Sequence, residues 1–126
     1  MSYTTQMDAA RQGIITPEMK AVAASEHIAE DELRELIALG QVIIPANKNH
    51  KCLKPNGIGS RLRTKINVNL GTSRDWTDLD MEMEKVKSAV DMGAEAIMDL
   101  SSCGDTQKFR RKLTSECPAT IGTVPI

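Results

Sequence analysis

The sequence predicts an α/β protein with a helical N-terminal region over residues 1–61 and the start of a parallel sheet over residues 62–126. Two observations predict this division. In the first part, apolar residues recur at helical spacing between helix start and stop signals. From residue 65 onward, segments alternate as strand, helix, strand, helix, strand. That alternation is typical of parallel strands joined by right-handed crossovers.

The N-terminal region carries signals for three helices. Gly13 is a natural left-handed residue for a helix end. Thr16-Pro17-Glu18 then supplies an N-cap, a first-turn proline and a first-turn acid. Gly40 follows a run with helical periodicity and should terminate it. We therefore expect helices over residues 4–12, 17–24 and 30–39.

A loop rich in Asn, Lys, Gly and Pro occupies residues 46–61, after a short β-like run over residues 41–44. It contains Gly57-Ile58-Gly59, which resembles the start of a dinucleotide-binding fingerprint. Leu62 stands where the third glycine belongs, and no strand precedes the pair. The segment therefore predicts a plain turn.

The second half predicts three strands and two helices. Ile66, Val68 and Leu70 alternate with polar residues, so they should share one face of a strand, with Asn69 on the other. Thr77 and Asp80 form a possible capping box, and Asp105 a possible N-cap. The expected strands are 65–70, 94–100 and 119–126, and the expected helices are 75–91 and 105–116.

Such a sheet is unfinished within 126 residues, because the chain stops as its third strand ends. Parallel sheets normally have helices on both faces and no bare edge. Only Tyr3, Trp76 and Phe109 are aromatic, which is thin filling for an independent core. We therefore expect the sheet to continue in residues outside this chain.

The composition limits the classes of partner that this chain is expected to bind. The formal net charge is −1, from 16 basic and 17 acidic residues, which gives no electrostatic footprint for nucleic acid and no polybasic membrane anchor. The polar start lacks a signal-peptide core, and no stretch approaches the length of a membrane span. The expected location is the cytoplasm, without nucleic-acid or membrane partners.

The cysteines are few and widely spaced. Cys52, Cys103 and Cys117 contain no closely spaced pair, so reduced thiols are expected rather than a disulfide framework or a metal site. His50 and Cys52 lie two residues apart, but no third ligand is near in the sequence.

Candidate chemistry lies at the ends of the predicted strands, where ligands bind in parallel sheets. Asn69 offers both donors and acceptors. Asp99 has two equal interpretations, a ligand or proton-transfer group or a carboxylate that caps the following loop. Met98 by itself is typical of core filling. The basic run over residues 108–112 favours a solvated helix face around Phe109 over a phosphate site.

Six segments together resemble signatures of the phosphomethylpyrimidine synthase family, in family order and over nearly the whole chain. They are Thr5-Gln6-Met7, Gly13-Ile14-Ile15-Thr16-Pro17-Glu18-Met19, Ile43-Ile44-Pro45-Ala46-Asn47, Lys65-Ile66-Asn67-Val68-Asn69-Leu70-Gly71, Met98-Asp99-Leu100-Ser101 and Ile121-Gly122-Thr123-Val124-Pro125-Ile126.

The resemblance implies a (β/α)8 barrel of which the three strands would be the first three. It also implies a radical reaction on 5-aminoimidazole ribotide, in which S-adenosylmethionine is cleaved at a 4Fe-4S cluster. Two family substrate contacts map onto Asn69 and Met98, and a tyrosine contact would fall just after Ile126. The family's cluster cysteines are absent here, and neither His27 nor His50 matches its metal-binding histidines.

What else the resemblance implies concerns the complete protein. A full-length homodimer with a divalent metal such as zinc is expected, and this fragment alone should be inactive. The alternative is a truncated, inactive paralogue that serves as a binding or assembly partner.

The family has two branches. One makes the thiamin pyrimidine phosphate, and the other makes 5-hydroxybenzimidazole, a precursor of the cobalamin lower ligand. Ser102-Cys103-Gly104 departs from the common thiamin pattern. Together with Glu95-Ala96-Ile97-Met98 and Glu116-Cys117-Pro118-Ala119, this departure favours the hydroxybenzimidazole branch.

Overall fold

The computed structural model describes residues 2–124, and the chain divides into two compact units. The first unit comprises Met1–Ala46 and Pro55–Thr64, and the second comprises Asn47–Lys54 and Lys65–Ile126. The segment Asn47–Lys54 thus groups with the second unit, although it lies within the first 61 residues. Each unit has its own hydrophobic core.

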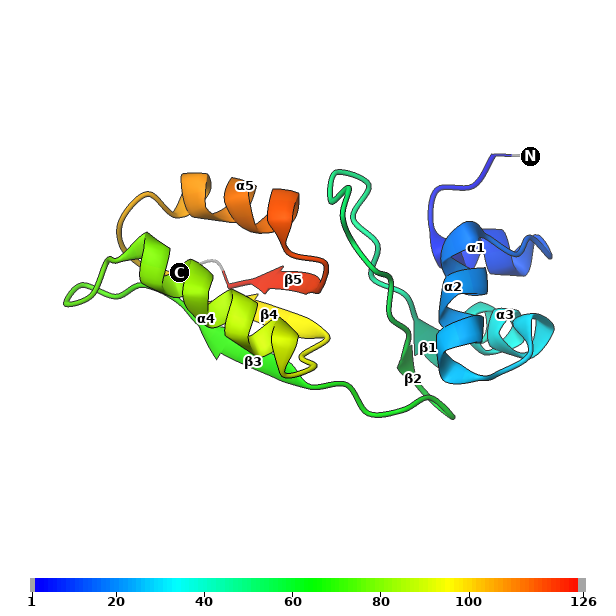
Figure 1. Cartoon of the computed structure of the whole chain (residues 1–126). Helices are drawn as coiled ribbons and strands as arrows, with labels where there is room; N and C mark the ends of the chain where they lie inside the picture. Colours follow the sequence, from blue (N-terminus) through cyan, green and yellow to red (C-terminus); the bar gives the residue numbers. More distant parts are fainter. Residues whose placement is uncertain (1, 125–126) are drawn as a thin grey trace. The chain divides into compact units, whose positions relative to one another are not determined.

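The first unit is a cluster of three helices with a small two-stranded sheet (Figure 1). Its core is formed by apolar side chains from all three helices and the first strand, including Met19, Val22, Leu33, Ile37 and Val42. The elements are α1 (Gln6–Arg11), α2 (Pro17–Glu26), α3 (Glu30–Ala38), β1 (Val42–Ile43) and β2 (Ile58–Gly59). The three predicted helices are confirmed, with ends displaced by one or two residues.

The helix signals act as expected. Thr16 is extended and caps α2, because its hydroxyl accepts from the amide of Met19 at 3.2 Å. The same hydroxyl donates to Oε1 of Gln6 at 2.6 Å, which ties the start of α2 to α1. Gly13 has a φ of +76°, the left-handed conformation that glycine adopts without strain.

The predicted turn at Gly57-Ile58-Gly59 is wrong. Ile58 and Gly59 form β2, which pairs antiparallel with β1, and Ile43 lies opposite Ile58. A Cβ at Gly59 would clash with the backbone of Gln41, so this strand crosses its partner where only glycine fits. The pairing partner lies far along the chain, and no local pattern reveals it.

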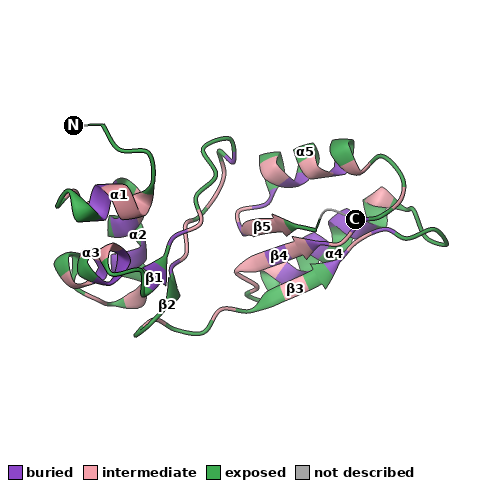
Figure 2. Cartoon of the chain, turned by 180° about the vertical axis from the view of Figure 1, so that it is seen from behind, coloured by how far each residue is buried: buried purple, intermediate pink, exposed green. Residues whose placement is uncertain are grey.

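The second unit is a three-stranded parallel sheet with two helices on one face (Figures 1 and 2). The strand order is β3-β4-β5, and both pairs are parallel. The predicted alternation of strands and helices is therefore confirmed. The elements are β3 (Asn67–Leu70), α4 (Leu79–Asp91), β4 (Ala96–Asp99), α5 (Thr106–Glu116) and β5 (Thr120–Thr123). Pro125 and Ile126, which end the third predicted strand, lie outside the described residues.

Strand alternation divides the sheet into a covered face and an open face. Leu70 and Ile97 pack beneath the helices with Val86, Phe109 and Leu113. The opposite face carries alternate residues of the same strands, and Figure 2 shows the sheet from this side. Its residues, paired in two rows by the strand register, are Asn67, Ala96 and Thr120, then Asn69, Met98 and Gly122.

The two helices differ in how well their starts were predicted. Asp105 caps α5 as expected, because Oδ1 accepts from the amide of Lys108 at 3.0 Å. The capping box of Thr77 and Asp80 is wrong. Asp78 is the N-cap of α4, and its carboxylate accepts from two amides of the first turn. A carboxylate is favoured there by the helix dipole, while the preceding residues form their own tight turn.

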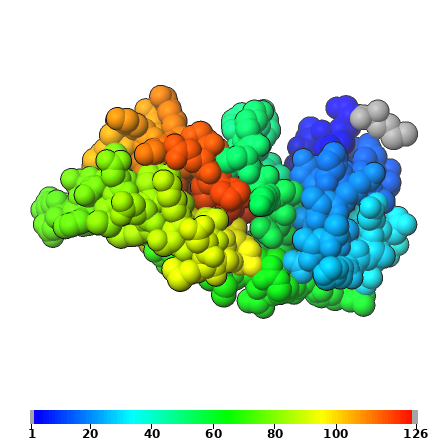
Figure 3. All heavy atoms as spheres, in the orientation of Figure 1, coloured from blue at the N-terminus to red at the C-terminus, as the bar shows by residue number. Residues whose placement is uncertain are grey.

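The helices of residues 2–124 are short. The longest, α4, has 13 residues, and none in this part of the chain is both long and apolar enough to cross a membrane. The surface of α4, yellow-green in Figure 3, carries Met81 at 40% exposure, and Met92 follows the helix at 82%.

Asn47–Lys54 joins the second unit through hydrogen bonds to the end of α5 and the residues that follow it. Nε2 of His50 donates to the carbonyl oxygen of Cys117 at 2.6 Å, and His50 is buried. The amide of Lys54 donates to the carbonyl oxygen of Pro118 at 2.9 Å. The thiol of Cys52 lies 3.2 Å from the carbonyl oxygen of Cys117. The segment thus holds the turn that leads into β5.

The Thr16 cap generates a stability prediction. Thr16→Ala removes the acceptor for a buried amide, so we expect a loss of about 1–2 kcal/mol in the free energy of unfolding. Urea denaturation followed by circular dichroism measures this loss. Ser25→Ala is the matched control, because its exposed hydroxyl only donates back to the carbonyl of Val22, and it should change stability by less than about 0.5 kcal/mol. Equal effects of the two variants would contradict the role of the cap.

Candidate functional site

The structure brings the two predicted site residues together. Asn69 of β3 and Met98 of β4 are register partners, and Gly122 of β5 completes their row. Asn69 is exposed and Met98 half-buried on the open face of the sheet. The row lies toward the carboxyl end of the three strands, the position at which parallel sheets bind ligands.

Gly122 makes room for Met98. A Cβ at Gly122 would come within 2.9 Å of Cε and 3.0 Å of Sδ of Met98, so the methionine lies across the glycine. Gly122 was not among the predicted site residues. An isolated glycine inside a strand, which marks a close approach, was the available signal.

Asn67 contacts Asn69 on the same face, as residues two apart in a strand must. Nδ2 of Asn67 donates to Oδ1 of Asn69 at 3.0 Å. Within residues 2–124 the Asn69 side chain makes no other hydrogen bond, so its Nδ2 donates to no atom of this part of the chain. Asn67 was not among the predicted site residues either.

Asp99 lies on the covered face and is fully buried. Oδ1 accepts from the amide of Ser101 at 2.9 Å, and Oδ2 accepts from Nε of Arg110 at 2.9 Å. Of the two interpretations of Asp99, the structure supports the one in which its carboxylate caps the following loop. The same carboxylate also forms an ion pair with Arg110. Lys108 is exposed, as expected for a solvated face around the buried Phe109, but Arg110 turns inward to Asp99.

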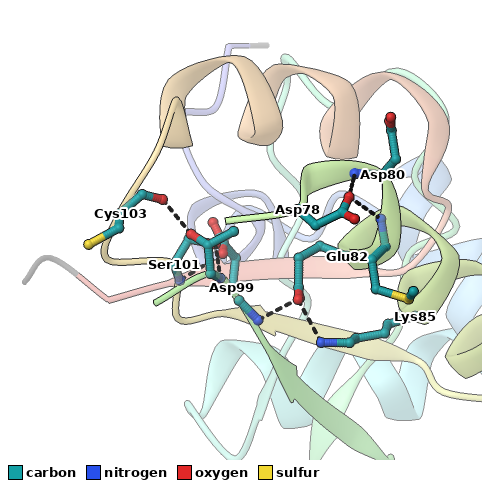
Figure 4. Close-up of polar contacts among 10 residues, drawn as sticks. Asp78, Asp80, Glu82, Lys85, Asp99, Ser101 and Cys103 are labelled. Atoms are coloured by element: carbon teal, nitrogen blue, oxygen red, sulfur yellow. Dashed lines mark hydrogen bonds and ion pairs between the residues drawn. The ribbon is translucent and has the colours of Figure 1, made fainter. Parts of the chain in front are cut away.

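The loops after β3 and β4 are joined by hydrogen bonds (Figure 4). The amide of Thr72 donates to Oγ of Ser101 at 3.0 Å, and the hydroxyl of Thr72 donates to the carbonyl oxygen of Cys103. The amide of Leu100 donates to the carbonyl oxygen of Leu70 at 2.7 Å. These contacts continue the sheet pairing into the loops at its carboxyl edge.

A buried acid completes this network. Glu82 of α4 is fully buried, although a glutamate in a helix ordinarily predicts a surface position. Its Oε2 accepts from the amide of Gly71 at 2.9 Å, and its Oε1 lies 2.6 Å from Nζ of Lys85 (Figure 4). The sequence signal that could have found it is spacing, because Glu82 lies three residues after Leu79 and four before Val86, on the apolar side of the helix.

The three cysteines are free, as predicted. Cys103 precedes α5, whereas Cys52 and Cys117 lie together at its other end. Among residues 2–124, no three His, Cys, Asp or Glu side chains lie close enough to hold a metal ion. The residues present therefore do not fit a 4Fe-4S cluster, which needs several thiolates in one place.

The fold defines the chain as part of an α/β protein built on a parallel sheet. A row formed by Asn69, Met98 and Gly122 lies near the carboxyl ends of its strands. The chain belongs to the radical SAM ThiC family, whose model matches residues 5–126.

Curated relatives agree with this family. The chain is 63% identical to a phosphomethylpyrimidine synthase of Clostridioides difficile (strain 630) and 64% identical to one of Alkaliphilus oremlandii (strain OhILAs). Each match covers all 126 residues of this chain and 29% of the relative. The chain thus spans less than a third of the length of these relatives.

The Asp99–Arg110 pair generates a second prediction. Asp99→Asn keeps an acceptor for the Ser101 amide but removes the charge that Arg110 faces. Because Arg110 is 36% exposed and can regain water, we expect a loss of about 1–3 kcal/mol in unfolding free energy rather than more. The control is Asp80→Asn, whose side chain is 96% exposed and lies 3.9 Å from Lys112. Urea denaturation should show less than about 0.5 kcal/mol for the control, and equal losses would rule out a special role for the buried pair.

Burial of Cys117 generates a pH prediction. Burial raises the pKa of the Cys117 thiol above its ordinary value. The neutral thiol is thus favoured in the folded state, and this contribution is lost as pH rises past the ordinary thiol pKa. At pH 7.5, we expect iodoacetamide to modify Cys117 of the folded chain more slowly than the half-buried Cys103. In urea, where the chain is unfolded, the two cysteines should react at the same rate. Peptide mass spectrometry measures both rates, and equal rates in the folded chain would contradict the prediction.

Proposed function

We propose that the complete protein containing this chain is a radical S-adenosylmethionine lyase that rearranges 5-aminoimidazole ribotide. The observation that carries the proposal is the row of Asn69 and Met98, on the open face of the sheet in a chain of this family. The resemblance assigns substrate contacts to these two residues, which the strand register makes neighbours.

We further propose that β3, β4 and β5 are the first three strands of a (β/α)8 barrel. Helices on one face fit the outside of such a barrel, and Asn69 and Met98, near the carboxyl ends of their strands, fit the end at which barrels bind substrates. An apolar groove beside β3 and α4, lined in part by Ile66, Val68, Ala89 and Met92, fits the last helix of a closed barrel. Within the described residues, β3 and β5 each have one unpaired edge, where further strands would join.

In this proposal the chain positions the substrate. The free amide group of Asn69 donates to a polar atom of the ribotide. The thioether of Met98, held across Gly122, gives a soft apolar contact to the imidazole ring. No residue of this chain is assigned a bond-breaking step.

The cofactors of the proposed enzyme are a 4Fe-4S cluster, S-adenosylmethionine and a divalent metal such as zinc. Their ligands would come from other parts of the protein, since residues 2–124 hold no group of side chains that fits a cluster. A full-length homodimer located in the cytoplasm completes the proposal.

Two products are candidates. The relatives at 63% and 64% identity are phosphomethylpyrimidine synthases, which favours the thiamin pyrimidine phosphate, and we propose it as the first product to test. Ser102-Cys103-Gly104, in the loop that adjoins the site, favours 5-hydroxybenzimidazole as the second. Mass spectrometry of the products formed by the complete enzyme distinguishes them.

Asn69→Ala tests the proposed site. The variant is made in a chimera in which these 126 residues replace the matching segment of the Clostridioides difficile relative. Loss of one ligand hydrogen bond should cost about 1–3 kcal/mol, or roughly 5- to 150-fold in the dissociation constant of 5-aminoimidazole ribotide. Isothermal titration calorimetry measures this constant.

Asn49→Ala is the matched control, because Asn49 is exposed and only its backbone amide bonds, to Asn47. It should leave the dissociation constant unchanged. Unchanged affinity in Asn69→Ala would remove Asn69 from the site. An intact mass of 13.8 kDa for the cellular protein would instead favour a partner role for the chain.

A further inference from the structure

We propose that Glu82 is a positioning residue for the substrate site, which acts by fixing the backbone that follows Asn69. The inference rests on the proposed function, because it takes Asn69 as a substrate contact. It adds a residue from α4, a helix on the covered face, to a site on the open face.

The burial of Glu82 needs a reason. Removing a carboxylate from water costs several kcal/mol unless it is paired and hydrogen-bonded. Lys85 alone does not explain it, since a pair at this spacing forms equally well on the helix surface, where the Lys85 side chain is 49% exposed. The second oxygen of Glu82 is the informative one, because it accepts from the backbone amide of Gly71.

Gly71 needs a partner from outside the sheet. Its φ is +147°, and a Cβ there would lie 2.5 Å from the amide nitrogen of Ser101. The chain therefore passes directly over the next loop, in a conformation that only glycine adopts freely. Glu82 supplies the acceptor for the Gly71 amide on one side. Ser101 holds the neighbouring Thr72 on the other.

The hydrogen bonds of Glu82 to Gly71 and of Ser101 to Thr72, here called the clamp, begin two residues after Asn69. Among residues 2–124, the Asn69 side chain is held only by Asn67, so the direction of its amide depends on its backbone. The register of β3 against β4 ends at Leu70, and Gly71 is the first residue beyond it. If the Gly71 amide loses its acceptor, the end of β3 is free to shift, and Asn69 moves relative to Met98.

The test is a double-mutant cycle on the binding of 5-aminoimidazole ribotide, in the chimera described above. Glu82→Leu keeps the volume but removes both acceptors, and we expect the dissociation constant to rise roughly three- to tenfold. In an Asn69→Ala background the same change should have no further effect. Glu82→Gln, which still accepts from the Gly71 amide, should restore affinity to within about twofold of the parent. The matched control is Asp91→Leu, an exposed acid of the same helix outside the groove beside β3, which should leave affinity unchanged.

The outcomes distinguish a failure of the role of Glu82 from a failure of the proposed function. A rise in the dissociation constant that is the same in both backgrounds would overturn the inference and leave a purely structural role for Glu82. An Asn69→Ala variant that binds as tightly as the parent would overturn the proposed function and the inference with it. If Glu82→Leu fails to fold, Glu82→Asp replaces it, because the shorter acid keeps the charge but falls short of Gly71. An Asp variant with parental affinity would then refute the clamp.

Discussion

The second unit depends on one constraint, the burial of a single face of a short parallel sheet beneath two helices. Leu70 and Ile97 must pack against Phe109 and Leu113, and because side chains alternate along a strand, Asn69 and Met98 are then directed to the opposite face. A slip of one residue would bury Asn69 and expose Leu70. The apolar packing on one side therefore fixes the polar row on the other.

Much of this fold could be predicted from local signals. Thr16 and Asp105 cap helices, and the strand–helix alternation appears in the expected order, since each feature depends on residues close in sequence. β2 could not be predicted, because its pairing with Ile43 joins distant segments. The start of α4 was misplaced because Thr77 and Asp78 are both good caps, and only the preceding turn decides between them.

The site was predictable in part. A strand end and a family resemblance pointed to Asn69 and Met98, and the register makes them neighbours. Glu82 was predictable only in part, because its spacing from Leu79 and Val86 places it on the apolar side of α4, but nothing local reveals the partner of a carboxylate there. Its burial follows from a glycine 11 residues earlier whose amide needs an acceptor. Buried polar groups of this kind become visible only when the hydrogen bonds of the backbone are accounted for.

The attachment of His50 and Lys54 beyond α5 has a consequence for how the chain can be divided. The second unit is discontinuous in sequence, and residues 55–64 of the first unit interrupt it. A single proteolytic or genetic cut therefore cannot release either unit whole. Expression fragments that begin at residue 62 would lack the segment Asn47–Lys54, which bonds to the carbonyl oxygen of Cys117. During synthesis, this segment would emerge well before the turn after α5, and it could form these hydrogen bonds only once that turn had been made.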